Sequence, residues 1–419
     1  MPNGSKHHHK RTTCRLCEGK NLDLKVPIVA SPLGGAFVTE ARLTERQEVY
    51  PLDMYQCGDC GHVQLLDVVD PEVIFADYTY FSGRTSLVEH FRRLADGIIR
   101  VEQLQRSAFV VDVGSNDGAF LTFFQDCGMK VLGVDAARNV ARYANDRGVE
   151  TLPEMFAEES AGKIRRDYGP ADLVTALNVF AHTDDLKGMA RGVRGLLADD
   201  GVFVFEVSYL VDVVDKMLLG TIFHEHLSYH TVKPLVSFLA REGLKLIDVR
   251  RVSVQGGSLV CTAQLAGRSR EIASSVSDLV RLEENEGVYE PSYLDNFARR
   301  LEAIAAETSA QIGNLKRRGK SIAAFGAARG GTLITHLFGL GDVVSFIVDD
   351  DPSKQGLYSP GYHIPVLPTS AMYERRPDYV AILAWVHAER IIESNRKYLE
   401  NGGRFIRFFP ELRIIAKDT

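Results

Sequence analysis

The chain has 419 residues, of which 45% are hydrophobic and 25% charged, and it carries a net charge of −6. This length predicts two or three domains, and the acidic balance argues against a nucleic-acid partner. No apolar run approaches the roughly 20 residues that cross a bilayer, and the polar segment 1–13 lacks the apolar core of a secretory signal. We therefore expect a cytoplasmic protein with neither a membrane nor a nucleic-acid partner.

Residues 1–70 are rich in turns and short strands and contain two CxxC pairs. Thiolates prefer soft cations, and a two-residue gap turns both sulfurs of a pair toward one tetrahedral ion. A redox motif needs only one pair, which favours a structural zinc over a redox site. The run His7–His9 is either a tag remnant or a native tail and does not enter the fold prediction. The predicted zinc ligands are Cys14, Cys17, Cys57 and Cys60.

Residues 71–268 are predicted to form an α/β domain. A helix-periodic stretch at about 85–105 comes first, and apolar runs then alternate with segments of helical length. Runs of this kind are typical of parallel strands buried between helices. The predicted strands are FVVDVG, VLGVDA, ADLVTAL and GVFVFEV.

Residues 269–419 are predicted to form a helical linker and a second α/β domain. The segment 269–318 is charged and helix-periodic, and strand–helix alternation resumes at Ser321 with SIAAFGAARGG, VVSFIVDD, YVAILAW and RFIRFF. Such alternation predicts a parallel sheet covered by helices on both faces. The expected chain therefore has a small zinc-binding domain followed by two Rossmann-like α/β domains.

The first strand of the middle domain runs into a turn with two glycines, at residues 112–118. Glycine lets the backbone approach a ligand closely. The match to the GxGxxG dinucleotide fingerprint is incomplete, and Asp112 and Asp117 suit a sulfonium better than a phosphate. Asp135, which ends the next strand, can accept both hydroxyls of a ribose.

This arrangement is similar to motifs I and II of class I methyltransferases, which bind S-adenosylmethionine. An NAD site and an empty α/β turn are the alternatives. The candidate cofactor contacts in these two motifs are Asp112, Gly114, Ser115, Asn116, Gly118 and Asp135.

Two further groups of polar residues follow at the expected edge of the sheet. Asn178 can reach the methionine part of the cofactor, and His182 faces either a substrate or the solvent. The segment Phe223–His226 comes after the fourth strand, and Ser228 excludes a match to the HExxH metal motif. A histidine beside a glutamate suits proton abstraction from a carbon next to a carbonyl, with a hydrogen-bonded structural cluster as the alternative.

Together with the CxxC pairs, the motifs VVDVGSNDGAFL, NVFAH, TIFHEHLSY, QGGSL, FGAARGGTLI and KQG…PGYHIPV resemble those of one family over nearly the whole chain. That family is the three-domain sugar C-methyltransferases of deoxysugar biosynthesis. The chain is most similar to the C-3′-methyltransferases that act on TDP-3-amino-4-keto-2,3,6-trideoxyglucose in nitrosugar pathways such as those of tetronitrose and kijanose. The resemblance implies S-adenosylmethionine and a structural zinc ion as cofactors, and a TDP-linked 4-keto deoxysugar as substrate.

The resemblance also implies roles for individual residues. His226 is the expected general base, and the side chains expected to line the sugar are Glu225, His182 and one of Tyr78 and Tyr80. The family has a tyrosine where Phe223 stands, so Phe223 is either native or an engineered change, and we expect altered substrate orientation or turnover. The implied substrate contacts are Phe223, His224, Arg329, Gly330, Thr332 and Lys354.

The implied reaction begins with transfer of the C3 proton, made acidic by the 4-keto group, to His226. The enolate oxygen then accepts a hydrogen bond from Tyr78 or Tyr80, and C3 attacks the sulfonium methyl. C-5′ methylation, O- or N-methylation, an NAD-dependent sugar-nucleotide epimerase or dehydrogenase, and a non-enzymatic scaffold are the alternatives. We expect a monomer.

Overall fold

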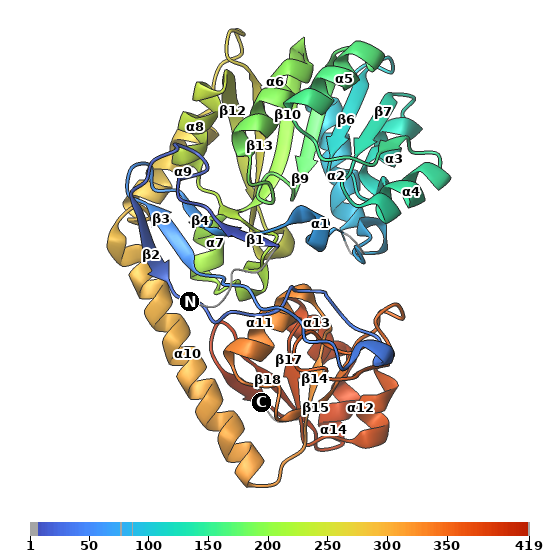
Figure 1. Cartoon of the computed structure of the whole chain (residues 1–419), viewed down its shortest axis with the longest axis vertical. Coiled ribbons are helices and arrows are strands. Elements are labelled where there is room, and N and C mark those ends of the chain that lie inside the picture. The colour runs from blue at the N-terminus through green and yellow to red at the C-terminus, as the bar shows by residue number, and fades with distance from the viewer. Residues whose placement is uncertain (1–6, 76–77, 86, 418–419) are drawn as a thin grey trace.

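The computed structural model describes residues 7–75, 78–85 and 87–417. Figure 1 shows two lobes, one formed by the middle domain and one by the C-terminal domain, with a long helix along the side of the molecule. The N-terminal region lies where the lobes meet, and part of it crosses onto the C-terminal lobe. An N-terminal region and two α/β lobes therefore pack closely on one another.

The N-terminal region consists of short strands and turns, as predicted. Its four-stranded antiparallel sheet has the order β11-β4-β3-β2, in which the edge strand β11 (Ser228–Tyr229) belongs to the middle domain. β1 pairs separately with β5, which brings part of the histidine run into the fold. The elements of this region are β1 (His8–Lys10), β2 (Leu22–Val26), η1 (Glu40–Arg42), β3 (Met54–Cys57), β4 (Val63–Leu65) and β5 (Asp67–Val69), and the short α1 (Pro71–Ile74) and η2 (Ser82–Arg84) follow it.

The middle domain is a seven-stranded sheet covered by helices. Its helices are α2 (Val88–Val101), α3 (Ala119–Asp126), α4 (Arg138–Asp146), α5 (Glu158–Tyr168), α6 (Leu186–Leu196), α7 (Leu210–Asp215), α8 (Val232–Arg241), η3 (Leu219–Thr221) and η4 (Val254–Gly256). Its strands are β6 (Phe109–Val113), β7 (Lys130–Val134), β8 (Thr151–Leu152), β9 (Ala171–Leu177), β10 (Leu197–Ser208), β12 (Leu244–Val252) and β13 (Ser258–Leu265).

The strand order of this sheet is β12-β13-β10-β9-β6-β7-β8, and β13 alone runs antiparallel to its neighbours. The predicted apolar runs occupy the centre, where every residue of β6 is buried. Buried strands of this kind need apolar side chains on both faces. The order, with one reversed strand, is that of class I methyltransferases and confirms the predicted fold class.

The C-terminal domain has a second sheet, ordered β16-β15-β14-β17-β18-β19, in which β19 alone is antiparallel to its neighbour. This is the predicted Rossmann-like arrangement. Its strands are β14 (Ile322–Phe325), β15 (Val344–Val348), β16 (Val366–Leu367), β17 (Tyr379–Ile382), β18 (Arg404–Arg407) and β19 (Arg413–Ile415). Its helices are α11 (Arg329–Leu337), α12 (Ser370–Arg375), η5 (Trp385–His387), α13 (Ala388–Ser394) and α14 (Arg396–Glu400).

The predicted helical linker is two helices with different roles. α9 (Ser274–Asn285) packs on β12 and α8 of the middle domain. α10 (Pro291–Arg317) packs against β2 and continues past the C-terminal lobe (Figure 1). α10 begins with a proline, which suits the first turn, and ends with basic side chains, which complement the negative end of the helix dipole.

Packing crosses the predicted boundary at residue 70. Val38 forms an isolated antiparallel bridge with Tyr358 of the C-terminal domain. The backbone N–H of Gly361 donates to Oε1 of Gln47 over 2.7 Å. A Cβ added to Gly34 would lie 2.8 Å from the carbonyl oxygen of Arg329, so this glycine permits close approach to the start of α11. The N-terminal region thus contacts both lobes.

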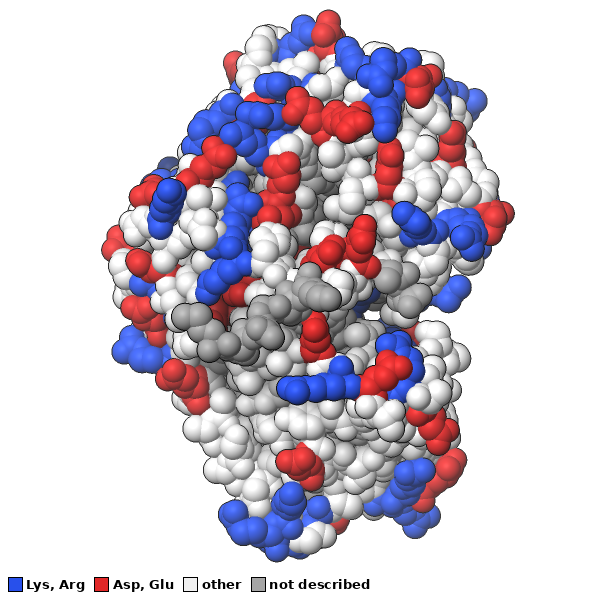
Figure 2. Space-filling view, viewed as in Figure 1, with Lys and Arg blue, Asp and Glu red and all other residues white. Residues whose placement is uncertain are grey.

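Among the described residues, no helix combines the length and the apolar character that crossing a membrane requires. On the face shown in Figure 2, the side chains of lysine and arginine are interspersed with those of aspartate and glutamate. This mixed pattern is typical of a solvated surface.

Candidate active site

The four predicted zinc ligands lie together in the N-terminal region. Their sulfur atoms are all within 4.8 Å of one another, with Cys14 and Cys60 Sγ 3.6 Å apart and Cys17 and Cys57 Sγ 3.5 Å apart. A tetrahedral ion with Zn–S bonds of about 2.3 Å separates its sulfurs by about 3.8 Å. Gly61, at φ +79°, allows the tight turn after the second pair. The geometry therefore fits a four-sulfur structural zinc site.

The zinc knuckle is joined directly to the loop that carries the histidine–glutamate cluster. Arg15, between the first two cysteines, is buried, and its Nη1 donates to the carbonyl oxygens of Leu65 and Leu227. The backbone N–H of Leu65 also donates to the carbonyl oxygen of Leu227 over 3.0 Å. Leu227 follows His226 directly and precedes β11, so the knuckle holds one end of this loop.

The turn after β6 has the close backbone packing predicted for a ligand-binding loop. Gly114 is at φ +71°, and an added Cβ would lie 2.2 Å from Val179 Cγ2. Any side chain here would therefore displace Val179. The N–H of Asn116 donates to Asp135 Oδ2, and that of Ala137 donates to Asp135 Oδ1, each over 2.8 Å. These bonds fix the Asp135 carboxylate beside the turn, where it can still accept ribose hydroxyls.

Asp112 lies in β6 just before the turn and is buried. Its Oδ1 accepts a hydrogen bond of 2.6 Å from Thr175 Oγ1, and burial raises the pKa of its carboxyl to about 7. Asn116, predicted as a cofactor contact, is tied to residues 80–82: its Oδ1 accepts from the N–H of Ser82, and its Nδ2 donates to the carbonyl oxygen of Tyr80. Asn116 therefore anchors the segment that carries the two tyrosines.

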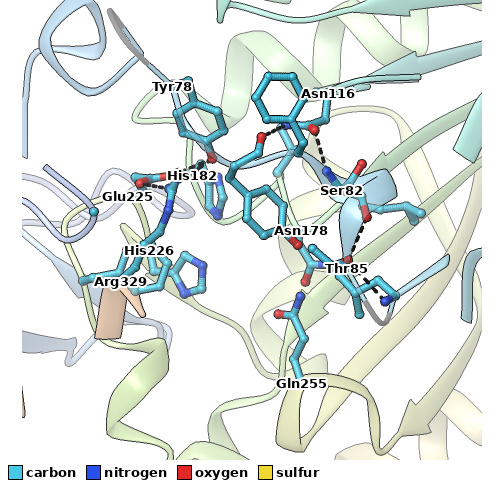
Figure 3. Close-up of a pocket in the computed structure, with 18 of the residues that line it drawn as sticks. Tyr78, Ser82, Thr85, Asn116, Asn178, His182, Glu225, His226, Gln255 and Arg329 are labelled. Atoms are coloured by element: carbon cyan, nitrogen blue, oxygen red, sulfur yellow. Dashed lines mark hydrogen bonds and ion pairs between the residues drawn. The ribbon is translucent and has the colours of Figure 1, made fainter. Parts of the chain in front are cut away.

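A cavity of about 910 Å³ opens at this edge of the sheet, and all three regions of the chain line it. Phe37 comes from the N-terminal region, and Lys354 and Trp385 come from the C-terminal domain. The volume lies in the upper part of the range for ligand pockets, about 300–1,000 Å³. Most of the predicted site residues line it, and Figure 3 shows how several of them face one another.

His226 lines this cavity and contacts two other rings. The centroid of its ring is 4.8 Å from that of His182, at an interplanar angle of 28°, and 4.1 Å from that of Phe223. Burial lowers the pKa of His226 to about 4 and holds that of His182 well below its ordinary value. Both imidazoles are therefore neutral near pH 7 and able to accept a proton.

Beside the histidines, Glu225 is held by a phenol and a guanidinium. Tyr78 Oη donates to Glu225 Oε2 over 3.0 Å, and Arg329 Nη1 contacts Glu225 Oε1 and donates to Tyr78 Oη over 3.1 Å. The guanidinium also lies over the rings of Tyr78 and Tyr80, 4.3 and 5.6 Å from their centroids. Burial raises the pKa of Tyr78, so it is a neutral hydrogen-bond donor.

Several other predicted residues have structural contacts of their own. His224 lines the cavity, but its ring packs on that of Tyr50 and its Nε2 is 3.2 Å from the Tyr50 carbonyl oxygen. A Cβ added to Gly330 would lie 2.4 Å from Gly220 Cα, so Gly330 allows α11 to approach η3. Lys354 Nζ lies 3.9 Å from Asp349 Oδ2.

Two predicted contacts are absent from the cavity lining. Gly118, at φ +77°, caps α3 and faces Val149, where an added Cβ would be 2.8 Å from Cγ1. Thr332 is buried within α11, where its carbonyl oxygen lies 2.9 Å from His336 Nδ1. Arg329 begins α11, so the expected glycine-rich turn is the first turn of a helix.

Sequence reasoning missed His90 and Gln255, which line the cavity, and Glu206, which lies behind its lining. Glu206 lies in β10 and bonds to Asn178 and to His90 of α2. Gln255, in the QGGSL motif, lines the cavity with a left-handed backbone at φ 50°. A single acidic residue inside the apolar run GVFVFEV was the available signal for Glu206, because glutamate is rarely fully buried without a partner.

Taken together, the strand order, the turn at Gly114 and the fixed Asp135 carboxylate define the middle domain as that of an S-adenosylmethionine-dependent methyltransferase. Three family models match the chain in the order in which its domains occur. They are described as "Putative zinc binding domain" (residues 14–75), "Methyltransferase domain" (residues 87–249) and "C-methyltransferase C-terminal domain" (residues 253–410).

Over nearly its whole length the chain resembles the C-methyltransferase NovU of Streptomyces niveus, with 36% identity over 408 residues and 97% of each chain covered. The chain therefore belongs to the C-methyltransferase family, and S-adenosylmethionine and structural zinc are its cofactors.

Two solved structures show weaker similarity. A methyltransferase of Clostridium acetobutylicum ATCC 824 is 14% identical, with a TM-score of 0.35, and the match covers 47% of this chain and 96% of that one. CcbJ of Streptomyces caelestis is 15% identical, with a TM-score of 0.34, and covers 46% and 96%.

Proposed function

We propose that the protein methylates C-3′ of a TDP-linked 4-keto deoxysugar, with TDP-3-amino-2,3,6-trideoxy-4-keto-glucose as the favoured acceptor and His226 as the general base. The observation that carries this proposal is the position of a neutral, buried imidazole in the same cavity as the Gly114 turn. A base and a methyl-donor site that share one cavity suit methylation of a carbon acid, in which proton removal and methyl transfer occur at the same atom.

In this reaction the 4-keto group acidifies the proton on C3, and His226 accepts that proton. The electron pair of the C–H bond forms an enolate, whose oxygen requires a hydrogen-bond donor. Arg329 has further N–H groups to donate and supplies a positive charge, whereas Tyr78 would have to turn its single O–H from Glu225 to the enolate. When bound, S-adenosylmethionine supplies the electrophilic methyl group that C3 takes up, with S-adenosylhomocysteine as the second product.

A nucleotide-linked acceptor suits the shape of the cavity. The histidine cluster and the Gly114 turn lie on the side of the middle domain, while Lys354 and Trp385 line the cavity from the C-terminal domain. We therefore assign the sugar to the side of His226 and the nucleotide to the C-terminal wall, where the Lys354 ammonium can approach a diphosphate. The resemblance described above points to the same division.

The test is a methyl-transfer assay with S-adenosylmethionine over a small panel of TDP-4-ketosugars, with the product position assigned by NMR. A new methyl group on a quaternary C-3′ is the expected result. Methylation at C-5′, or on oxygen or nitrogen, would contradict the assignment of the acceptor atom. Exchange of the C3 proton with deuterated water in the absence of methyl donor should be detectable, because proton removal comes first.

We also propose that one copy of the chain is the working unit, because three regions of the same chain line the cavity. Light scattering should give a mass near 46.4 kDa. A stable dimer under assay conditions would contradict this proposal.

A further inference from the structure

Three polar side chains form a connected chain beneath one end of the cavity. Glu206 is 0% exposed, and its two carboxylate oxygens have different partners. Oε1 accepts a hydrogen bond of 3.1 Å from Asn178 Nδ2, and Oε2 lies 2.6 Å from His90 Nε2. The side chains of His90 and Asn178 both line the cavity, whereas Glu206 lies behind them.

Glu206 determines which end of the Asn178 amide faces the cavity. A carboxylate can only accept hydrogen bonds, so Asn178 must turn its NH₂ group toward Glu206. The backbone N–H of Asn178 also donates to the Glu206 carbonyl oxygen over 2.8 Å, which holds the residue in its left-handed conformation at φ 57°. The oxygen of the Asn178 side-chain amide, Oδ1, is then the atom available to a ligand, and it can bind only a hydrogen-bond donor.

The sheet order determines which part of the methyl donor reaches this oxygen. β7, which precedes Asp135, and β9, which precedes Asn178, lie on either side of β6. Strands are about 4.8 Å apart, so the two positions are separated by about 10 Å along the sheet edge. A nucleoside whose ribose binds Asp135 therefore extends its 5′ substituent past Gly114 toward Asn178. In S-adenosylmethionine that substituent ends in an ammonium and a carboxylate.

We propose that Glu206 is a positioning residue for the methyl donor: with His90, it fixes Asn178 so that the amide oxygen binds the donor's ammonium group. The buried carboxylate adds a negative charge behind the amide, which favours a cationic group in front of it. The inference rests on the use of S-adenosylmethionine and not on the identity of the acceptor. Failure of every TDP-4-ketosugar in the assay to be methylated would therefore not contradict it.

The test measures binding without turnover. Calorimetry compares S-adenosylhomocysteine, which carries the ammonium, with 5′-methylthioadenosine, which lacks the amino-acid part. In Glu206→Gln the new NH₂ group can donate to Asn178 and let its amide turn round. We expect the dissociation constant of S-adenosylhomocysteine to rise about tenfold or more, the size of one hydrogen bond to a charged group, and that of 5′-methylthioadenosine to change less than about twofold.

A double-mutant cycle separates positioning from a general structural role. Asn178→Ala alone should weaken S-adenosylhomocysteine binding, and adding Glu206→Gln should then have no further effect, because Glu206 acts through Asn178. Glu242→Gln is the matched control, since Glu242 is buried in the same domain but pairs with Arg191 outside the cavity. Equal weakening of both ligands by Glu206→Gln, or additive effects in the cycle, would overturn the proposal. If Glu206→Gln does not fold, Asn178→Ala must still weaken binding of S-adenosylhomocysteine more than binding of 5′-methylthioadenosine.

Discussion

The zinc knuckle and the cavity differ in how they are built. The knuckle takes its four sulfur ligands from two short motifs within the N-terminal region. The cavity takes its lining from segments between Gly35 and His387, and its chemistry depends on pairs such as Glu225 with Arg329, which are far apart in the sequence. A local motif specifies its ligands by spacing alone, whereas a site between domains acquires its properties only when the domains pack.

The two regions are nevertheless connected through one loop. Arg15 of the knuckle reaches the carbonyl oxygen of Leu227, and β11 completes the knuckle's sheet. Loss of folded structure at the knuckle should therefore disturb the acceptor side of the cavity more than the methyl-donor side.

The largest expected effect is that of removing the zinc. Structural zinc contributes about 10 kcal/mol or more to the folding of its domain, so Cys57→Ser should unfold the knuckle, release β11 and abolish methyl transfer. Binding of S-adenosylhomocysteine, measured by calorimetry, should persist because the contacts proposed for it lie in the middle domain. Cys127→Ser is the control, since Cys127 is an exposed thiol outside the knuckle. Full activity of Cys57→Ser would show that the knuckle is dispensable.

His226→Asn tests the cavity without disturbing the knuckle. Loss of a general base should lower turnover by about 100-fold or more, and exchange of the C3 proton should disappear with it. Melting temperature and S-adenosylhomocysteine affinity should remain close to those of the unaltered protein. Near-normal exchange in this variant would remove His226 from the role of base.

Acidification should destabilise the protein through buried histidines in and next to the cavity. Burial lowers the pKa of His224 and His226 to about 4 and that of His230 to about 3, below the value of about 6.5 in the unfolded chain. Their contribution to stability is complete above pH 6.5 and is lost as the pH falls toward these values, because the unfolded state binds the protons first.

The measurement is denaturant unfolding between pH 7 and 4. His224→Gln keeps a donor for the Tyr50 carbonyl oxygen but removes one titrating group. The slope of the free energy of unfolding against pH should therefore fall by about 1.4 kcal/mol per pH unit. An unchanged dependence would mean that His224 titrates normally in the folded protein.

The smallest expected effect concerns Gln255. Its left-handed backbone is unfavourable by about 1 kcal/mol for a residue with a side chain, so Gln255→Gly should stabilise the protein by about that amount. Methyl transfer should nevertheless fall, because the side chain lines the cavity. Gln103→Gly is the matched control: Gln103 is also left-handed, at φ 52°, but is exposed and lies outside the cavity lining. Equal activity in both variants would show that the Gln255 side chain has no function in the cavity.

The sequence allowed prediction of features that depend on local patterns. The apolar runs predicted both α/β sheets, and the spacing within the two CxxC pairs predicted all four sulfur ligands of the knuckle. Contacts between distant segments were not predictable in this way. No local pattern indicates that β11 would join the N-terminal sheet, or that Asn116 would hold the segment at Tyr80. Thr332 was placed with the substrate because a motif gives its position in the chain but not the face of the helix it occupies.

The pairing of β11 with β4 has a consequence for engineering. A hybrid enzyme made by exchanging N-terminal domains between relatives at residue 70 would leave a strand of one parent to complete the sheet of the other. The exchanged unit should therefore include residues 223–229 as a second, separate insert. Chimeras designed on this principle should retain folded knuckles more often than those joined at a single crossover point.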